Sequence, residues 1–77
     1  MQVNILLFGR LTDITGKSSF TLPDVADTDT LVQQLQQQYP AFINTPYIIA
    51  VNKDVIQGNT KLADNSEVAL LPPYSGG

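Results

Sequence analysis

The chain contains no cysteine and no histidine. Without cysteine it can form no disulfide and offers no thiolate nucleophile, and without histidine it lacks the side chain that most often acts as a general base near neutral pH. The same two absences remove the soft ligands that transition metals prefer. A self-contained catalytic or metal centre is therefore hard to build from these 77 residues.

Positive charge is also scarce. Four lysines and arginines stand against seven acidic residues, giving a net charge of -3. The chain shows no basic stripe of the kind that a phosphate backbone requires, so we expect no nucleic-acid partner. The acidic excess suits a basic partner surface, where it would speed encounter, or serves solubility alone.

Long apolar runs are missing, and the N-terminus has no charged leader followed by an apolar segment. We therefore expect no membrane association and a soluble cytoplasmic protein. Asp24, Asp27 and Asp29 lie close together, but the spacing and closing glutamate of an EF-hand are absent, so helix capping and solvation explain them better. We predict no metal site and no bound cofactor.

What is present is a regular alternation of apolar residues. It predicts strands over residues 2–8, 18–22, 47–51 and 67–71, with a short extended segment at 55–57. Residues 28–38 carry Leu31 and Leu35 at helical spacing, with Thr28 as the expected cap and Pro40 as the stop. The stretches 13–17 and 41–46 have the composition of turns and loops.

This order of elements predicts an α+β fold of the β-grasp (ubiquitin-like) type, with one main helix packed on one face of a mixed sheet. By analogy with that fold, the first and last strands are adjacent and parallel. The length allows one domain, which we assign to residues 1–77, with residues 72–77 as an extended C-terminal tail.

The first and last strands are apolar on both faces. If Val3, Ile5, Leu7, Val68 and Leu70 face the helix, the opposite face carries Leu6, Phe8, Ala69 and Leu71, and Val55 joins them from the neighbouring hairpin. An apolar cluster on the uncovered face of a small sheet indicates a partner-binding surface. The alternative is that the strand phase slips or that residues 9–17 cover these side chains.

The tail reads Pro72, Pro73, Tyr74, Ser75, Gly76, Gly77. The prolines fix φ and cannot continue a sheet ladder, so they end a strand and begin a stiff stalk. The two glycines have no Cβ and can enter a slot too narrow for other residues. On its own, a terminal Gly-Gly is equally compatible with a frayed end or a remnant of cloning.

Several segments together resemble a known family. They are Ile5-Leu6-Leu7-Phe8-Gly9 followed by Asp13 and Gly16, the helix start at Thr28 with Leu31, Ala50-Val51-Asn52 leading into Val55, and the whole stretch from Glu67 to Gly77. The chain resembles the small subunit of molybdopterin synthase, the MoaD family of ubiquitin-like sulfur carriers. The resemblance spans essentially the whole sequence.

The resemblance implies a mechanism based on the Gly77 carboxylate. An E1-like adenylyltransferase would use ATP to form an acyl-adenylate, and a sulfur donor enzyme would supply sulfur for a terminal thiocarboxylate. The tail would then enter the large synthase subunit and give sulfur to the cyclic pyranopterin monophosphate precursor, forming the dithiolene of molybdopterin. Phe8, Val55 and Leu71 would anchor both partners in turn. The chain would act within a heterotetrameric enzyme and not as an enzyme alone.

Other functions stay open at this point. The acceptor of sulfur could belong to another pathway, such as thiamine thiazole, cysteine or tRNA thiolation. A ubiquitin-like protein modifier would use the same activated carboxylate against a lysine amine. A β-grasp binding module with an incidental tail is a further alternative, and it predicts indifference to removal of Gly76 and Gly77.

Overall fold

The computed structural model describes residues 2–73. In chain order the elements are β1 (Gln2–Leu7), α1 (Leu11–Thr15), β2 (Ser19–Pro23), α2 (Thr28–Gln38), the 3-10 helix η1 (Pro40–Ile43), β3 (Ile48–Val51), β4 (Asp54–Val55) and β5 (Glu67–Leu71). No helix within the described range is long and apolar enough to cross a membrane.

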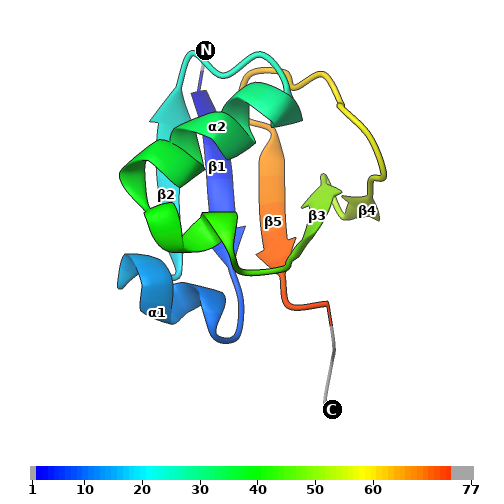
Figure 1. The fold of residues 1–77 in the computed structure, drawn as a ribbon. Helices are drawn as coiled ribbons and strands as arrows, with labels where there is room; N and C mark the ends of the chain where they lie inside the picture. The colour runs from blue at the N-terminus through cyan, green and yellow to red at the C-terminus, as the bar shows by residue number, and fades with distance from the viewer. Residues whose placement is uncertain (1, 74–77) are drawn as a thin grey trace.

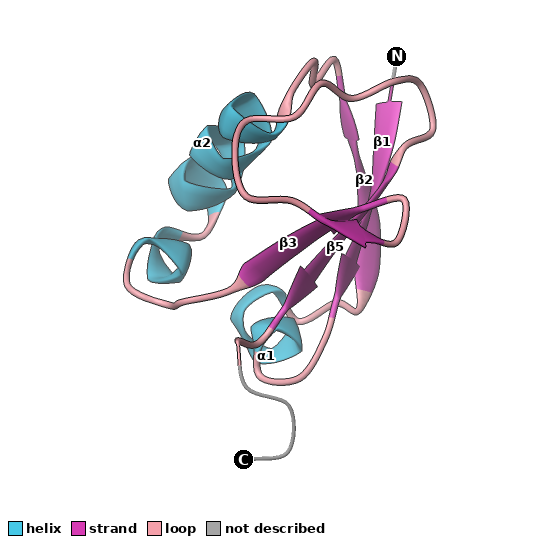
Figure 2. Ribbon diagram, turned by 90° about the vertical axis from the view of Figure 1, so that its right-hand side faces the viewer, coloured by secondary structure: helices cyan, strands magenta, loops and turns pink. Residues whose placement is uncertain are grey.

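The strands form one mixed sheet in the order β2-β1-β5-β3-β4. β1 and β5 are parallel neighbours at its centre, and the other pairs are antiparallel. Helix α2 crosses one face of this sheet, and none of the helices formed by residues 2–73 lies on the opposite face (Figures 1 and 2). The predicted β-grasp architecture, including the parallel pairing of the first and last strands, is confirmed.

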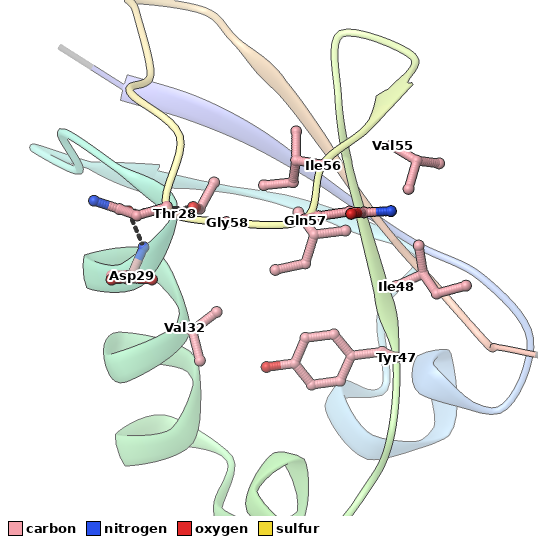
Figure 3. A pocket seen from close by; sticks show the side chains of 11 residues that line it. Thr28, Asp29, Val32, Tyr47, Ile48, Val55, Ile56, Gln57 and Gly58 are labelled. Atoms are coloured by element: carbon pink, nitrogen blue, oxygen red, sulfur yellow. Dashed lines mark hydrogen bonds between the residues drawn. The ribbon is translucent and has the colours of Figure 1, made fainter.

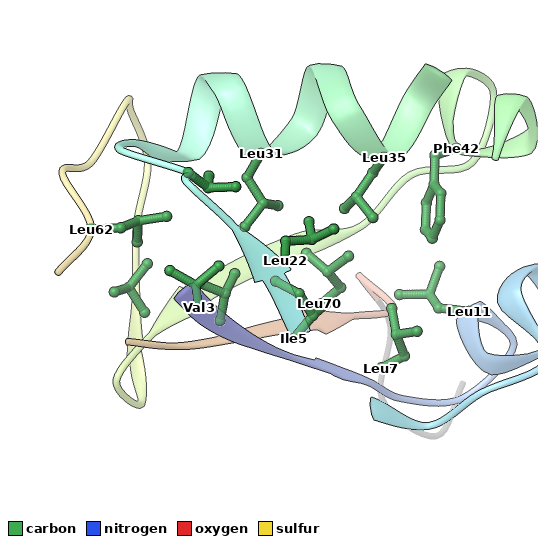
Figure 4. Close-up of a cluster of buried hydrophobic side chains, with 13 residues drawn as sticks. Val3, Ile5, Leu7, Leu11, Leu22, Leu31, Leu35, Phe42, Leu62 and Leu70 are labelled. Atoms are coloured by element: carbon green, nitrogen blue, oxygen red, sulfur yellow. The ribbon is translucent and has the colours of Figure 1, made fainter. Parts of the chain in front are cut away.

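The hydrophobic core lies between α2 and the covered face (Figure 4). Leu31 and Leu35 of α2 point toward Val3, Ile5 and Leu70 of the central strands, and all of these side chains are fully buried. This confirms which side of β1 and β5 faces the helix. Complete burial of an aliphatic side chain contributes roughly 1.5–3 kcal/mol, so this layer holds the helix to the sheet.

The short helix α1 was not predicted. Residues 13–17 were expected as a turn, but α1 begins at Leu11, whose side chain is buried in the core, and ends at Gly16 with a left-handed φ of 73°. The Gly16 N–H donates to the Thr12 carbonyl, which is a common way to end a helix. Five residues are too few for helical periodicity to show in a sequence.

The cap of α2 was assigned to the wrong residue. The side chain of Asp27, not that of Thr28, accepts the Thr30 N–H at 2.9 Å. Thr28 is buried instead, and its hydroxyl oxygen accepts the Thr60 N–H at 2.9 Å. Thr28 therefore ties the loop before β5 to the start of α2.

Several boundaries also differ from the predicted ones. β1 ends at Leu7, β3 starts at Ile48, and β4 is only Asp54–Val55. The β3–β4 turn is Asn52-Lys53 with φ of 50° and 75°, the positive pair of a type I′ hairpin. Part of the loop predicted at 41–46 is the helix η1, which begins at Pro40. β2 extends to Pro23, which an edge strand tolerates.

Candidate functional site

The uncovered face of the sheet carries an apolar row that runs across four strands. Leu6 of β1 pairs with Ala69 of β5, Ala69 with Ala50 of β3, and Ala50 with Val55 of β4. Residues opposite one another on neighbouring strands project to the same face. The register therefore places Leu6, Ala69 and Val55, predicted as parts of one surface, in a single line.

A second row lies next to the first, closer to the tail. Ile48 pairs with Leu71, and Phe8 follows β1 with its N–H donating to the Leu70 carbonyl at 3.2 Å. We call the two rows together the tail-end patch, which consists of Leu6, Phe8, Ile48, Ala50, Val55, Ala69 and Leu71.

The tail-end patch has a sharp polar boundary. One pairing step toward the start of β5, Asn4 lies opposite Glu67 and also opposite Thr21. Asn52 completes this polar row, because its side-chain oxygen accepts the Glu67 N–H and its own N–H donates to the Glu67 carbonyl. The apolar surface is thus confined to the end of the face where β5 leads into Pro72.

The side chains of the patch are accessible to a partner. Phe8 is 44% and Val55 62% exposed, while Leu6, Ala69 and Leu71 are half-buried. The alternative that the strand phase slips or that residues 9–17 cover this surface is therefore wrong, since α1 directs Leu11 into the core and leaves Phe8 exposed.

Ile48 and Ala50 were missed as members of this surface. The signal was available, because residues 48–51 are apolar at every position and so present apolar side chains to both faces, as β5 does. What the sequence could not give was the register that places β3 beside β5. Ala50 is almost fully buried between its cross-strand neighbours Ala69 and Val55.

The base of the tail packs against the turn between β1 and α1. A Cβ built on Gly9 would lie 2.7 Å from Cγ of Pro72, so the two residues are in close contact. Beside this contact, a small hollow of about 140 Å³ is lined by Arg10, Pro46, Pro72 and Pro73. The remaining predicted tail residues, Tyr74, Ser75, Gly76 and Gly77, lie outside the described range.

A larger groove of about 470 Å³ lies between α2 and the β3–β4 edge (Figure 3). Val32, Tyr47 and Ile56 line it, and Ile48 and Val55 border both the groove and the tail-end patch. Burial raises the pKa of the Tyr47 phenol above its ordinary value. The lining residues supply no pair of groups suited to general acid–base catalysis.

The polar interactions of Asp27 stabilise the start of α2. The hydrogen bonds that Thr30 donates, together with one from Asn59, hold the pKa of Asp27 below its ordinary value. No group of histidine, cysteine or acidic side chains within residues 2–73 is arranged to hold a metal ion. The described part of the chain presents an exposed apolar patch next to the start of the tail at Pro72.

The β-grasp fold, with an apolar face next to an outgoing C-terminal stalk, places the chain in the class of ubiquitin-like proteins. A family model described as the ThiS family matches residues 5–77. The chain therefore belongs to the ThiS family.

Two individual proteins are similar to this chain over its full length. The molybdopterin synthase sulfur carrier subunit of Chlamydomonas reinhardtii is 32% identical, with the alignment covering 100% of both chains. A chain in the Helicobacter pylori complex of subunits 1 and 2 of molybdopterin-converting factor is 30% identical with a TM-score of 0.75, again over 100% of both chains.

The small archaeal modifier protein 1 of Methanosarcina acetivorans has a TM-score of 0.82, covering 99% of this chain and 96% of that one. Its sequence identity is 24%, so this likeness concerns the fold alone. The resemblance to molybdopterin synthase small subunits, seen first in the sequence, is confirmed by the full-length relatives.

Proposed function

We propose that this chain is the sulfur-carrying small subunit of molybdopterin synthase. The observation that carries the proposal is the continuity between the tail-end patch and the stalk, since Leu71 belongs to the patch and Pro72 follows it directly. A partner that covers the patch receives the tail at the edge of the same interface. Full-length relatives named as sulfur carrier subunits support this reading.

The proposed partner on the patch is the large synthase subunit. The Helicobacter pylori relative, which is similar over its whole length, was solved in a complex of subunits 1 and 2. Exposed Phe8 and Val55 and half-buried Leu71 are the anchors that we assign to this interface. Aromatic and aliphatic anchors near the centre of an interface commonly contribute most of the binding free energy.

The proposed chemistry takes place at the Gly77 carboxylate. An E1-like adenylyltransferase joins this carboxylate to the AMP part of ATP and releases pyrophosphate. Sulfide-level sulfur from a donor enzyme then attacks the acyl carbon, displaces AMP and leaves a thiocarboxylate. The chain supplies the carboxyl group and the partners supply the acids, bases and nucleotide site, in keeping with a sequence that has no histidine or cysteine. The use of ATP makes the cytoplasm the compartment that we propose.

In the last step the thiocarboxylate gives its sulfur to the cyclic pyranopterin monophosphate precursor inside the large subunit, and the tail returns to a carboxylate. Gly76 and Gly77 would allow the chain end to reach the acceptor through a narrow channel, because glycine adds no side-chain width. Two rounds would complete one dithiolene.

The test is intact-mass analysis of the chain after incubation with the activating enzyme, ATP and a sulfur donor. We expect the mass change of one oxygen replaced by sulfur at Gly77, and dithiolene formation once the large subunit and the pterin precursor are added. Deletion of Gly77 should leave a folded domain that binds the large subunit but transfers no sulfur. Sulfur transfer by the truncated chain would contradict the mechanism.

Two outcomes of the same experiment would favour another function. Thiocarboxylate formation without transfer to the pterin precursor would point to a different sulfur acceptor. Isopeptide adducts on lysines of other proteins would point to a protein modifier.

A further inference from the structure

Gly9 occupies the turn between β1 and α1, directly beneath the start of the tail. Its φ is 60°, in the left-handed region. A Cβ at this position would lie 2.7 Å from Pro72 Cγ, 3.6 Å from Pro72 Cδ and 4.0 Å from Pro72 Cβ. The proline ring therefore rests on the space that a side chain would occupy.

The turn that carries Gly9 is held on both sides. Before it, the Phe8 N–H donates to the Leu70 carbonyl of β5 at 3.2 Å. After it, the Gly9 carbonyl accepts the Thr12 N–H at 3.2 Å and the Thr12 hydroxyl at 2.9 Å. Leu11, between them, is fully buried in the core. Because the turn is fixed in this way, an added Cβ would displace Pro72 rather than Gly9.

A displaced Pro72 would change where the tail points. Pro72 follows the last residue of β5, and its ring fixes φ, so the ring and the chain direction move together. To reach ordinary van der Waals contact at about 3.4 Å, the ring would have to shift by several tenths of an ångström.

We propose that Gly9 is a positioning residue, which seats Pro72 and thereby sets the direction in which the chain leaves the domain toward the partner's active site. This inference rests on the proposed function, because direction matters only if the tail delivers a reacting group. It assigns α1 a role as well, since α1 fixes the turn against which the stalk packs.

The chain provides a matched control in Gly16. Gly16 also has a left-handed φ, 73°, but a Cβ there would meet nothing within 4 Å. Gly9→Ala and Gly16→Ala thus place alanine in the same unfavourable backbone region. Only the Cβ of Gly9→Ala also clashes with Pro72. A difference between the two variants isolates the contact with Pro72.

The experiment uses thiocarboxylated chains and the large subunit with its pterin precursor. Single-turnover sulfur transfer is measured over a titration of the large subunit, which separates binding from the rate at saturation. For Gly9→Ala we expect a saturating rate lower by about tenfold, since misplacement of a reacting group by a fraction of an ångström has effects of this order, with unchanged binding. Gly16→Ala should transfer sulfur at the wild-type rate.

A rescue variant tests whether the loss passes through the proline ring. In a Pro72→Ala background the ring atom that meets the added Cβ is gone, so Gly9→Ala should cause no further loss there. Equal rates for Gly9→Ala and Gly16→Ala, or a full further loss in the Pro72→Ala background, would overturn the proposal.

A measurement on the unmodified chain keeps this proposal separate from the proposed function. Nuclear Overhauser contacts between the Gly9 α protons and the Pro72 ring show directly whether the ring packs on Gly9. This measurement depends neither on sulfur transfer nor on the folding of the Gly9→Ala variant. Absence of these contacts would overturn the proposed packing of Pro72 on Gly9. If they are present but the wild-type chain accepts no sulfur, the proposed function fails and the positioning role fails with it.

Discussion

The two faces of the sheet are built from the same strands but have different tasks. On the covered face, Val3 and Ile5 of β1 and Val68 and Leu70 of β5 are completely buried under α2. On the open face lies the tail-end patch, whose side chains remain at least partly exposed except for that of Ala50. Because side chains alternate along a strand, neighbouring residues can serve stability and recognition independently.

The open face itself divides into a polar part and an apolar part. The apolar part lies where β1 and β5 end, and Figure 1 shows the chain leaving β5 at that end of the sheet, near α1. An apolar open face gives the isolated domain no packing advantage comparable to that of the core. Its confinement to the end next to the tail is consistent with the proposed role of the patch as a partner-binding surface.

The largest expected difference between the two faces is the loss of stability when Leu70 on the covered face is replaced. Leu70→Ala should lower the free energy of unfolding by about 3 kcal/mol, because a fully buried leucine leaves a cavity as well as lost apolar contact. Urea denaturation followed by circular dichroism measures this loss. In a small domain with a stability of roughly 5–15 kcal/mol, the effect is large.

The neighbouring residue is the matched control for this change. Leu71→Ala removes the same atoms from the open face, where the side chain is only half-buried, and should cost less than about 1 kcal/mol of stability. Equal losses for the two leucines would show that the two faces do not differ as described.

For partner binding we expect the opposite: substitutions on the open face should weaken binding while leaving the stability of the domain largely unchanged. Phe8→Ala should weaken binding to the large subunit by about 2 kcal/mol, or roughly thirtyfold in Kd, because an exposed aromatic becomes a buried anchor in the complex. Isothermal titration calorimetry with the large subunit measures the change, and the stability of the free domain should change little.

Thr21→Ala is the control on the open face outside the tail-end patch. Thr21 is exposed on edge strand β2 and pairs with Asn4 in the polar row. We expect its removal to leave binding within about a factor of two of wild type, as for a residue outside the energetic centre of an interface. If Thr21→Ala weakened binding as much as Phe8→Ala, the patch would be wrongly bounded.

The sequence predicted those features that repeat with a period. Alternation identified the two faces of β1 and β5, and the spacing of Leu31 and Leu35 identified α2 with its observed limits. The apolar members on those strands and Val55 followed from the same pattern. Such features can be predicted because side chains on one face of a strand or helix recur at a fixed spacing in the sequence.

The missed features depend on contacts between distant segments. Ile48 and Ala50 join the patch only through the register of β3 with β5, and the seat of Pro72 on Gly9 joins residues far apart in the chain. The capping error at Thr28 has a similar cause, because its hydroxyl is used by Thr60 in another loop. Local pattern cannot reveal a partner that the fold supplies.

The smallest effect concerns the opposite end of the sheet, at the start of α2. There hydrogen bonds from the Thr30 side chain, from the Thr30 N–H at 2.9 Å and from the Asn59 side chain at 3.3 Å hold the pKa of the Asp27 carboxyl below its ordinary value. A lowered pKa in the folded state means that the charged form stabilises the fold. This contribution is complete above the unfolded-state value of 3.8 and is lost as pH falls through the lower folded-state pKa.

Asp27→Asn should therefore lower the Tm at neutral pH, and the difference from wild type should shrink as pH falls below 3.8. Thr28→Val is the matched comparison at the same helix end, because it removes the hydroxyl that accepts the Thr60 N–H and has no titratable group. Its loss of Tm should persist throughout the pH range, measured by thermal melts in buffers of equal ionic strength. A difference for Asp27→Asn that is equally independent of pH would show that the cap acts by shape and hydrogen bonding alone, without its charge.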